Sequence, residues 1–283
     1  MKVNENNRYI ISLIEFMNQC SCSFTTVKSI SKQLDDCGFI KLSCSDKWSL
    51  KSGDKFYVTP NDSAIFAFSL GSQSIQNGFK VIAAHSDSPT FKIKPNGIIN
   101  SEGNVVKLNT EPYGGGILNT WYDRPLSISG RVILKGESAF KPITRIIKID
   151  KPIMIIPQLP IHFNRAVNDG VKISKQKDML PICGVINDSA ERENLILHLI
   201  AKELEIEIGD IIDFDLSLYC TEKATLVGIN DDFVTSGRLD DLSMVHAATT
   251  AFIEIENSDS NNILAIFDNE ETGSGTKQGA GSP

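Results

Sequence analysis

The sequence predicts an α/β domain that is interrupted by a mainly β segment. Apolar residues recur at helical spacing near the N-terminus, and a short apolar run, Ile263–Phe267, ends abruptly in carboxylates. Between these regions the texture changes to short β-like runs broken by Gly, Pro and Asn. We therefore predict that residues 1–90 and 231–283 form the two parts of the α/β domain and that residues 91–230 form an inserted β-rich domain.

Two amphipathic helices are predicted at the start of the chain. The apolar residues within Asn7–Met17 have helical spacing. In the second helix, Thr25 or Thr26 can serve as the N-cap, and Gly38 stands where a C-terminal cap glycine belongs. The apolar stripe of this second helix consists of Val27, Ile30 and Leu34.

Strand-like spacing follows these helices. Lys55–Thr59 and Ser63–Leu70 are predicted strands, separated by a turn at Pro60-Asn61-Asp62. A further strand, Gly78–Ala84, contains a run of apolar residues that we expect to be buried. This strand ends in the polar segment His85-Ser86-Asp87-Ser88-Pro89.

The inserted segment is predicted to be mainly β. One clear helix lies inside it, from Ser189 as its cap through Glu191 to Leu204. The β-like runs are Phe91–Lys94, Val105–Leu108, Leu126–Leu134, Ile153–Ile156, Phe214–Leu218 and Ala224–Gly228.

The last part of the chain is predicted to contain a helix and then a buried strand. The helical stripe consists of Leu242, Val245, His246, Thr249 and Ile253. The run Ile263–Phe267 is typical of a parallel-sheet strand buried on both faces, and open α/β sheets bind ligands at the carboxyl ends of their strands. Asp268, Glu270 and Glu271 would repel one another at that end unless they share a cation or a proton. A solvated acidic turn closed by Gly273 is the alternative.

Composition restricts the class of protein. Hydrophobic residues make up 41% and charged residues 22%, the profile of a soluble globular protein. The net charge of −7 argues against a nucleic-acid or anionic-membrane partner. We find no apolar stretch long enough to span a bilayer and no apolar core of a secretory signal at the N-terminus. The six cysteines are scattered, so we expect reduced packing residues in a cytoplasmic protein.

Polar ends of predicted elements could together form a metal site, at His85-x-Asp87, Asp240-Asp241 and Glu270-Glu271. A neutral imidazole with carboxylates suits Zn²⁺, Mn²⁺ or Co²⁺. Two such ions about 3.5–4 Å apart need a bridging carboxylate, and a carboxylate beside them can act as the general base for water. Asp87 is a candidate to accept the second ring N–H of His85. A structural histidine and a helix-capping Asp240 remain the alternatives.

At these residues the chain resembles the aspartyl aminopeptidase and aminopeptidase I-like metallopeptidases. The blocks that carry the resemblance are His85-Ser86-Asp87-Ser88-Pro89, Gly114-Gly115-Gly116 with Thr120-Trp121-Tyr122-Asp123-Arg124, Ile156-Pro157 with Ile161-His162, Arg238-Leu239-Asp240, and Asp268-Asn269-Glu270-Glu271 with Gly273-Ser274 and Gln278-Gly279-Ala280. They occur in the family's order, and the resemblance runs from the N-terminal helices to the last residue.

The resemblance implies a dinuclear zinc aminopeptidase, a hydrolase that removes one N-terminal amino acid from a peptide. The implied metal ligands are His85, Asp240 as the bridge between the two ions, and Glu271. Glu270 would be the general base that takes a proton from the metal-activated water, and Asp87 would orient His85. His162 would lie in a segment that reaches a neighbouring subunit's active site and contacts substrate.

The family's architecture is an α/β/α peptidase domain interrupted by a β-rich dimerisation domain, and we expect the same division here. The family forms homo-oligomers, commonly dodecamers built from dimers. Many members prefer Asp or Glu at the substrate N-terminus and some prefer neutral residues. The metal would be zinc, with manganese or cobalt as alternatives that the ligands also accept.

One departure from the family pattern lies at the end of the chain. The family completes its site with an Asp and a His after the Glu-Glu block, whereas this sequence stops at Pro283, so we expect a C-terminally truncated member. The remaining histidines, His198 and His246, lie in helical stripes and are expected to pack in the core. The alternative to an active enzyme is therefore a catalytically inactive homologue that acts only in assembly.

Overall fold

A computed structural model describes residues 5–72, 75–188, 192–255 and 259–282 of the chain. The chain divides into two compact units. Unit 1 comprises residues 1–88 and 223–283, and unit 2 comprises residues 89–222. The candidate metal ligands all belong to unit 1.

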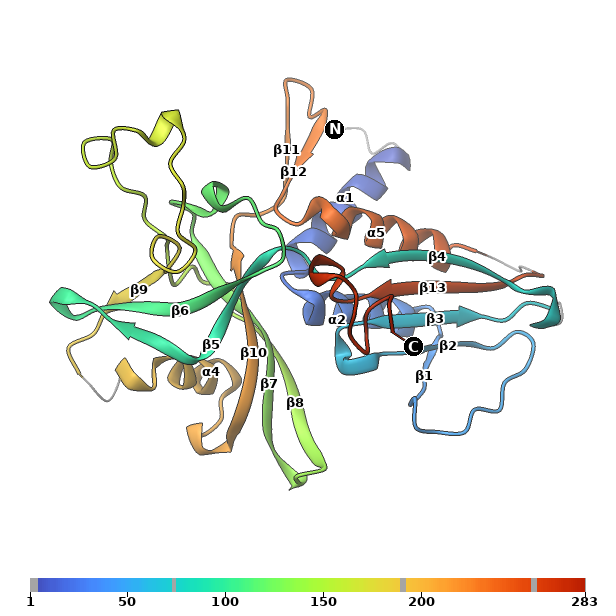
Figure 1. The fold of residues 1–283 in the computed structure, drawn as a ribbon. Helices are drawn as coiled ribbons and strands as arrows, with labels where there is room; N and C mark the ends of the chain where they lie inside the picture. Colours follow the sequence, from blue (N-terminus) through green and yellow to red (C-terminus); the bar gives the residue numbers. More distant parts are fainter. Residues whose placement is uncertain (1–4, 73–74, 189–191, 256–258, 283) are drawn as a thin grey trace. The chain divides into compact units, whose positions relative to one another are not determined.

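Unit 1 is built on a mixed sheet with the strand order β1-β2-β3-β13-β4 (Figure 1). Its strands are β1 (Ile40–Lys41), β2 (Lys55–Val58), β3 (Ile65–Ser69), β4 (Phe79–His85) and β13 (Asn261–Phe267). β13 pairs parallel with β4 but antiparallel with β3, so the expectation of a parallel sheet around this strand is only half right. The apolar run of β13 follows from its position between two strands, where both faces of the strand are largely covered.

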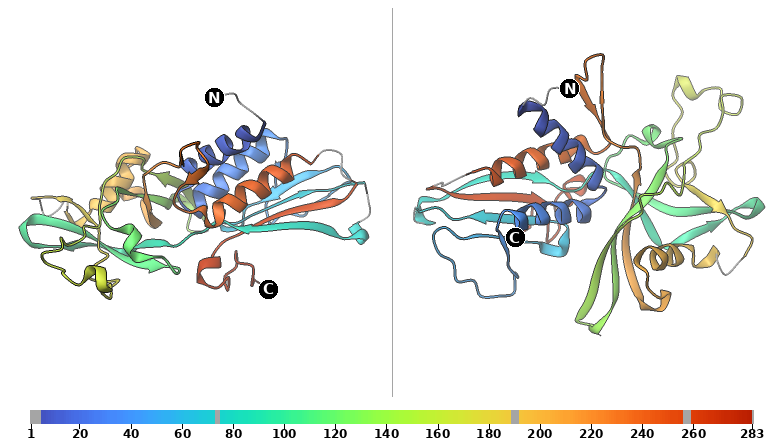
Figure 2. Two further views of the ribbon diagram at one scale, coloured as in Figure 1. Left: turned by 90° about the horizontal axis from the view of Figure 1, so that it is seen from above. Right: turned by 180° about the vertical axis from the view of Figure 1, so that it is seen from behind.

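Helices α1 (Glu5–Gln19), α2 (Ser23–Asp36) and α5 (Leu239–Ile253) cover one face of this sheet (Figure 2, left). The segment after β13 lies on the opposite side of the sheet. The predicted N-cap of α2 is wrong, because the helix begins at Ser23 and Thr25 lies within its first turn, where its Oγ1 accepts the Cys22 amide at 3.0 Å. Gly38 follows the helix with a φ of 79°, the left-handed conformation that a C-terminal glycine adopts readily.

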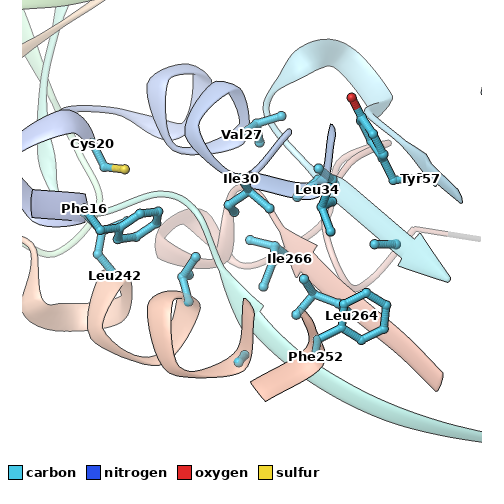
Figure 3. Packing of buried hydrophobic residues seen from close by; sticks show 14 of the residues in the cluster. Phe16, Cys20, Val27, Ile30, Leu34, Tyr57, Leu242, Phe252, Leu264 and Ile266 are labelled. Atoms are coloured by element: carbon cyan, nitrogen blue, oxygen red, sulfur yellow. The ribbon is translucent and has the colours of Figure 1, made fainter. Parts of the chain in front are cut away.

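The core of unit 1 lies between these helices and the sheet (Figure 3). Ile30 and Leu34 of α2 point toward Leu264 and Ile266 of β13, and all four side chains are fully buried. The predicted helical stripes and the apolar strand therefore bury against one another, which stabilises the unit through removal of apolar surface from water.

The buried run predicted in β4 is wrong. Val81 is 60% exposed and Ile82 is 41% exposed. β4 is the last strand of the sheet among the residues that the structure describes, so it has a paired neighbour on one side only. The strand was predicted correctly in position but not in burial.

Unit 2 contains an antiparallel sheet with the strand order β8-β7-β10-β5-β6-β9. Its strands are β5 (Thr90–Asn100), β6 (Val105–Tyr113), β7 (Leu126–Ser138), β8 (Lys141–Lys148), β9 (Ile182–Val185) and β10 (Ile211–Cys220). Helix α4 (Leu195–Leu204) packs Ile196 and Ile200 into the core of this unit. The predicted start of this helix, at Ser189 and Glu191, lies outside the described residues.

Smaller elements complete the two units. A two-stranded hairpin in unit 1 pairs β11 (Thr225–Val227) with β12 (Phe233–Thr235). The 3₁₀ helices are η1 (Pro60–Asp62), η2 (Ile75–Asn77), η3 (Glu102–Asn104), η4 (Leu118–Trp121), η5 (Val167–Asp169), η6 (Ile208–Asp210) and η7 (Glu270–Thr272). None of the described helices is both long enough and apolar enough to cross a membrane.

The histidines and cysteines predicted to pack divide into buried, partly buried and exposed groups. His246 is buried against Phe16, with ring centroids 5.7 Å apart, whereas His198 is exposed on α4, so its packing prediction is wrong. All six cysteines are free thiols. Cys20 is buried, and burial raises its pKa to about 12. Cys37 and Cys44 are exposed and do not pack.

Candidate metal centre

The site begins where β4 and β13 end side by side. Their parallel pairing sets His85, the last residue of β4, opposite Phe267, the last residue of β13. The next residue, Ser86, donates its amide to the Phe267 carbonyl at 2.8 Å and its Oγ to the Ser63 carbonyl at 2.6 Å. The polar residues that follow both strands therefore start at the same level of the sheet.

Asp87 connects the two strand ends. Its side chain is 3% exposed, and its two carboxylate oxygens accept the backbone amides of Glu270 and Glu271, each at 3.2 Å. Its Oδ1 also lies 3.3 Å from Nδ1 of His85. One buried carboxylate therefore contacts both the imidazole ring and the turn that carries the two glutamates.

The other ring nitrogen of His85 faces further carboxylates. Nε2 lies 3.4 Å from Oδ1 of Asp240, 3.8 Å from Oδ2 of Asp241 and 3.9 Å from Oε2 of Glu270. The His85 side chain is 14% exposed, whereas Asp240 is 84% and Glu270 is 56% exposed. A largely buried imidazole therefore lies beside solvent-accessible carboxylates from two other segments.

The start of α5 brings the aspartates to this point. Arg238 precedes the helix with a φ of 63° and donates its Nε to the carbonyl of Cys20 at 3.1 Å. Asp240 has an extended ψ of 112°, so the helix becomes regular only after the aspartate pair. Ser88 donates its Oγ to the Asp240 carbonyl at 3.0 Å, which ties the start of α5 to the segment after β4.

Asp241 has a place in the site that the sequence reasoning did not assign to it. Its Oδ2 accepts the backbone amide of His85 at 3.0 Å, and its side chain is 15% exposed. The only sequence signal was its position next to Asp240 in a first helical turn, where carboxylates are common for reasons of helix polarity alone.

Electrostatics in the cluster favour a cation. Burial lowers the pKa of His85, but the hydrogen bond that its ring donates to the Asp87 carboxylate and the charges of Asp241, Asp87 and Glu270 outweigh the effect of burial and raise the pKa to about 9. Burial and then the charge of Asp87 raise the pKa of Glu271 above its usual value. Carboxylates at such distances repel one another unless a proton or a metal ion lies among them.

The donor set fits a divalent metal ion. Ligand atoms lie within 4.8 Å of one another in two groups, one formed by His85, Asp240 and Asp241 and the other by His85, Glu270 and Glu271. One imidazole nitrogen with carboxylate oxygens is the chemistry that zinc, manganese and cobalt accept. The structure therefore brings together every predicted ligand, His85, Asp240 and Glu271, and both predicted catalytic residues, Asp87 and Glu270. The individual roles remain predictions.

His162 lies elsewhere in the chain. It belongs to unit 2 and is exposed in a turn beside Ile161. Its assignment as a substrate-binding residue remains a prediction.

Comparisons of the sequence with known proteins identify its relatives. The family model "Aminopeptidase I zinc metalloprotease (M18)" matches residues 16–283. A probable M18 family aminopeptidase 2 of Clostridium novyi is 50% identical over 97% of this chain and 64% of its own length. A probable aspartyl aminopeptidase of Ricinus communis is 34% identical over 96% of this chain and 64% of its own length. The chain thus spans about 64% of the length of these curated relatives.

Solved structures agree with this assignment. A chain in a structure of the Ape4 and Nbr1 complex is 33% identical, with a TM-score of 0.92 over 98% of this chain and 57% of its own. A chain of the yeast mApe1 dodecamer is 28% identical, with a TM-score of 0.82 over 97% of this chain and 64% of its own. The predicted α/β fold class and the family resemblance are both confirmed, and the chain belongs to the M18 family of aminopeptidase I zinc metalloproteases.

Proposed function

We propose that this chain carries the metal-binding core of an aminopeptidase that hydrolyses the N-terminal residue of peptides. The observation that carries the proposal is the convergence of Asp240 and Glu270 on Nε2 of His85, at 3.4 and 3.9 Å. Membership of the M18 family supports the same reaction class. The preferred N-terminal residue is Asp or Glu, with a neutral residue as the alternative, since a relative is named as a probable aspartyl aminopeptidase.

His85, Asp240 and Glu271 would hold two divalent ions, with Asp240 as the bridge. Zinc is the first choice, and manganese or cobalt suits the same nitrogen and oxygen donors. When bound, such ions supply Lewis acidity that polarises the substrate carbonyl and lowers the pKa of water. Asp87 holds the His85 ring through Nδ1, which leaves Nε2 directed at the acidic cluster.

Glu270 is the proposed general base. Its side chain is 56% exposed, so water and substrate can reach its carboxylate. Its backbone amide is fixed by Asp87, which limits how far the side chain can move from His85. A carboxylate that is accessible to water and held beside the ligands can take a proton from the attacking water and return it to the leaving amine.

Assembly is the second part of the proposal. We propose a homo-oligomer whose dimer building block is formed through the β-rich unit 2, with a dodecamer as the largest form. The dodecameric state of the yeast mApe1 relative supports this. In such an assembly His162 would contact substrate in a neighbouring subunit. We place the protein in the cytoplasm, where the six free thiols stay reduced, and we propose no nucleic-acid or membrane partner.

Hydrolysis of aspartyl, glutamyl and leucyl chromogenic amides by the purified 283-residue chain tests the activity. The assay is run with added Zn²⁺, Mn²⁺ or Co²⁺ and again with chelator. Chelator-sensitive turnover supports the enzyme. Folded protein without turnover with any metal supports the alternative, an inactive homologue that acts only in assembly.

Glu270→Gln separates catalysis from metal binding. Loss of a general base typically lowers the rate by about 10²–10⁴-fold. We expect this loss in turnover while Co²⁺ binding, followed by its visible absorption, stays within about threefold of wild type. The matched variant Glu271→Gln should weaken metal binding as well, since Glu271 is a proposed ligand. An unchanged rate in Glu270→Gln would refute the role of Glu270.

A further inference from the structure

The segment that follows β13 folds back on Asn269. This residue has a φ of 62°, the left-handed region that asparagine tolerates better than most residues. Its carbonyl accepts the amide of Ser274 at 2.8 Å. Its side-chain Oδ1 accepts two hydrogen bonds, from Oγ1 of Thr276 at 2.7 Å and from Nε2 of Gln278 at 2.9 Å. Both the backbone and the side chain of Asn269 therefore organise the returning loop.

The loop closes tightly around these contacts. The amide of Asp268 donates to the carbonyl of Gln278 at 3.0 Å, so the loop returns to the end of β13. A Cβ atom at Gly279 would lie 2.3 Å from the carbonyl oxygen of Ser274, which leaves room only for glycine. Movement of Asn269 would therefore be transmitted along the whole loop.

The proposed ligand and base come directly after Asn269 in the chain. Asp87 accepts the amides of Glu270 and Glu271, at 3.2 Å each. The loop closed by Asn269 also holds this turn, since the amide of Gly273 donates to the Glu270 carbonyl at 2.9 Å and that of Ser274 donates to the Asn269 carbonyl. The direction of the two carboxylates thus depends on both anchors.

We propose that Asn269 is a positioning residue, whose side-chain oxygen, by accepting Thr276 and Gln278, fixes the direction in which Glu270 and Glu271 are presented to His85. The inference rests on the proposed function for the consequence on metal binding, but not for the consequence on the loop. Asn269 acts through the backbone of the turn and the loop that follows it.

Two substitutions separate the acceptor from the backbone conformation. Asn269→Gly keeps the left-handed conformation and removes the acceptor, whereas Asn269→Asp keeps an oxygen that can accept both hydrogen bonds. If the side-chain oxygen matters, Asn269→Asp should keep the loop closer to wild type than Asn269→Gly does. If only the backbone conformation matters, Asn269→Gly should stay closer to wild type, because glycine adopts a positive φ more readily. Asn104→Gly is the matched control: Asn104 has a φ of 60° and makes its side-chain hydrogen bonds within unit 2.

Amide hydrogen exchange of the metal-free 283-residue chain is the first measurement, read by mass spectrometry on the peptide that covers residues 268–275. Loss of the two hydrogen bonds raises the population of the locally opened state about tenfold, which corresponds to about 1.4 kcal/mol. We expect about tenfold faster exchange in Asn269→Gly and a rate near wild type in Asn269→Asp and Asn104→Gly. Exchange in Asn269→Gly that equals wild type, or is slower than in Asn269→Asp, would overturn the inference.

Co²⁺ titration of the same proteins is the second measurement. Loss of groups that support metal ligands weakens metal affinity by about 10–100-fold, which we expect for Asn269→Gly but not for Asn269→Asp. Unchanged affinity in Asn269→Gly would overturn the positioning role while the proposed function stands. If the wild-type chain binds no Co²⁺ but the exchange rates follow the expected order, the positioning of the turn is supported and the proposed metal function is the part that fails.

Discussion

Removing the Asp87 carboxylate should loosen the end of the sheet that carries the candidate site. The carboxylate is 3% exposed and accepts two backbone amides, those of Glu270 and Glu271, while it pairs with the ring of His85. Asp87→Ala leaves these partly buried donors without that acceptor. Asp87→Asn has nearly the same shape but keeps one oxygen and loses the charge. The two substitutions therefore remove different fractions of one set of contacts.

The expected loss follows from the hydrogen bonds. A hydrogen bond to a charged group contributes about 1.5–3 kcal/mol, and an unsatisfied buried donor costs a similar amount. Both amide contacts are 3.2 Å long, at the outer end of the usual range, so the lower values apply. We expect Asp87→Ala to lower the free energy of unfolding by about 3 kcal/mol and Asp87→Asn by about 1.5 kcal/mol. Metal affinity should fall by about 10–100-fold in both variants.

The chain offers a clean reporter for this measurement. It has two tryptophans, and Trp48 packs in unit 1 against Phe56 with ring centroids 5.5 Å apart. In a Trp121→Phe background, urea unfolding in chelator followed by fluorescence therefore reports on unit 1. Asp54→Ala is the control, since Asp54 accepts one amide in a half-exposed turn and should cost about 1 kcal/mol. A loss below about 0.5 kcal/mol in Asp87→Ala would refute the account of Asp87 as the connector of the two strand ends.

Two further predictions concern the core between the helices and the sheet of unit 1. Burial lowers the pKa of His246 in the folded state, so as the pH falls the imidazole is protonated in the unfolded chain before it is protonated in the folded one. The contribution of neutral His246 to stability is therefore complete above about pH 6.5 and is lost as the pH falls below that value. Denaturation at about pH 7.5 and 5.5 should therefore show a smaller acid loss in His246→Gln than in wild type, and an equal loss would contradict the assignment. Ile266→Ala should cost about 2–5 kcal/mol because Ile266 is fully buried, whereas Ile40→Ala, at a site 65% exposed, should cost under about 1 kcal/mol by the same denaturation.

Much of unit 1 could be predicted because its elements follow their own local periodicity. The stripe of Val27, Ile30 and Leu34 lies buried on α2, and the run that ends at Phe267 forms the strand expected there. The positions of polar residues after strands also led directly to the cluster around His85, since parallel strands end at a common edge. Local sequence carries this information because each side chain faces one layer of the fold.

The predictions of burial from sequence are wrong where burial depends on neighbours that are distant in sequence. The apolar run in β4 resembles a central strand, yet Val81 is 60% exposed because the strand stands at the edge of the described sheet. His198 lies in an apolar pattern but faces outward on α4. The hydrogen bond that Asp241 accepts from the His85 amide could not be predicted either, because the two residues lie far apart in the sequence. Strand order and long-range hydrogen bonds are tertiary properties that no local pattern specifies.

The register between β4 and β13 connects the core of unit 1 to its chemistry. Leu264 and Ile266 face the helical layer, and the same pairing sets His85 opposite Phe267. A slip by one residue would turn Ile266 away from the core, so the cost of exposing it opposes any such slip.

A slip by two residues would preserve the buried face but move His85 by about 6.6 Å along the strand, beyond reach of the carboxylates that follow β13. The hydrogen bonds that the amides of Glu270 and Glu271 donate to Asp87 oppose that second slip, because they form only in the observed register. The apolar residues thus determine which face of β13 is buried, and the buried carboxylate determines the register of β13 against β4.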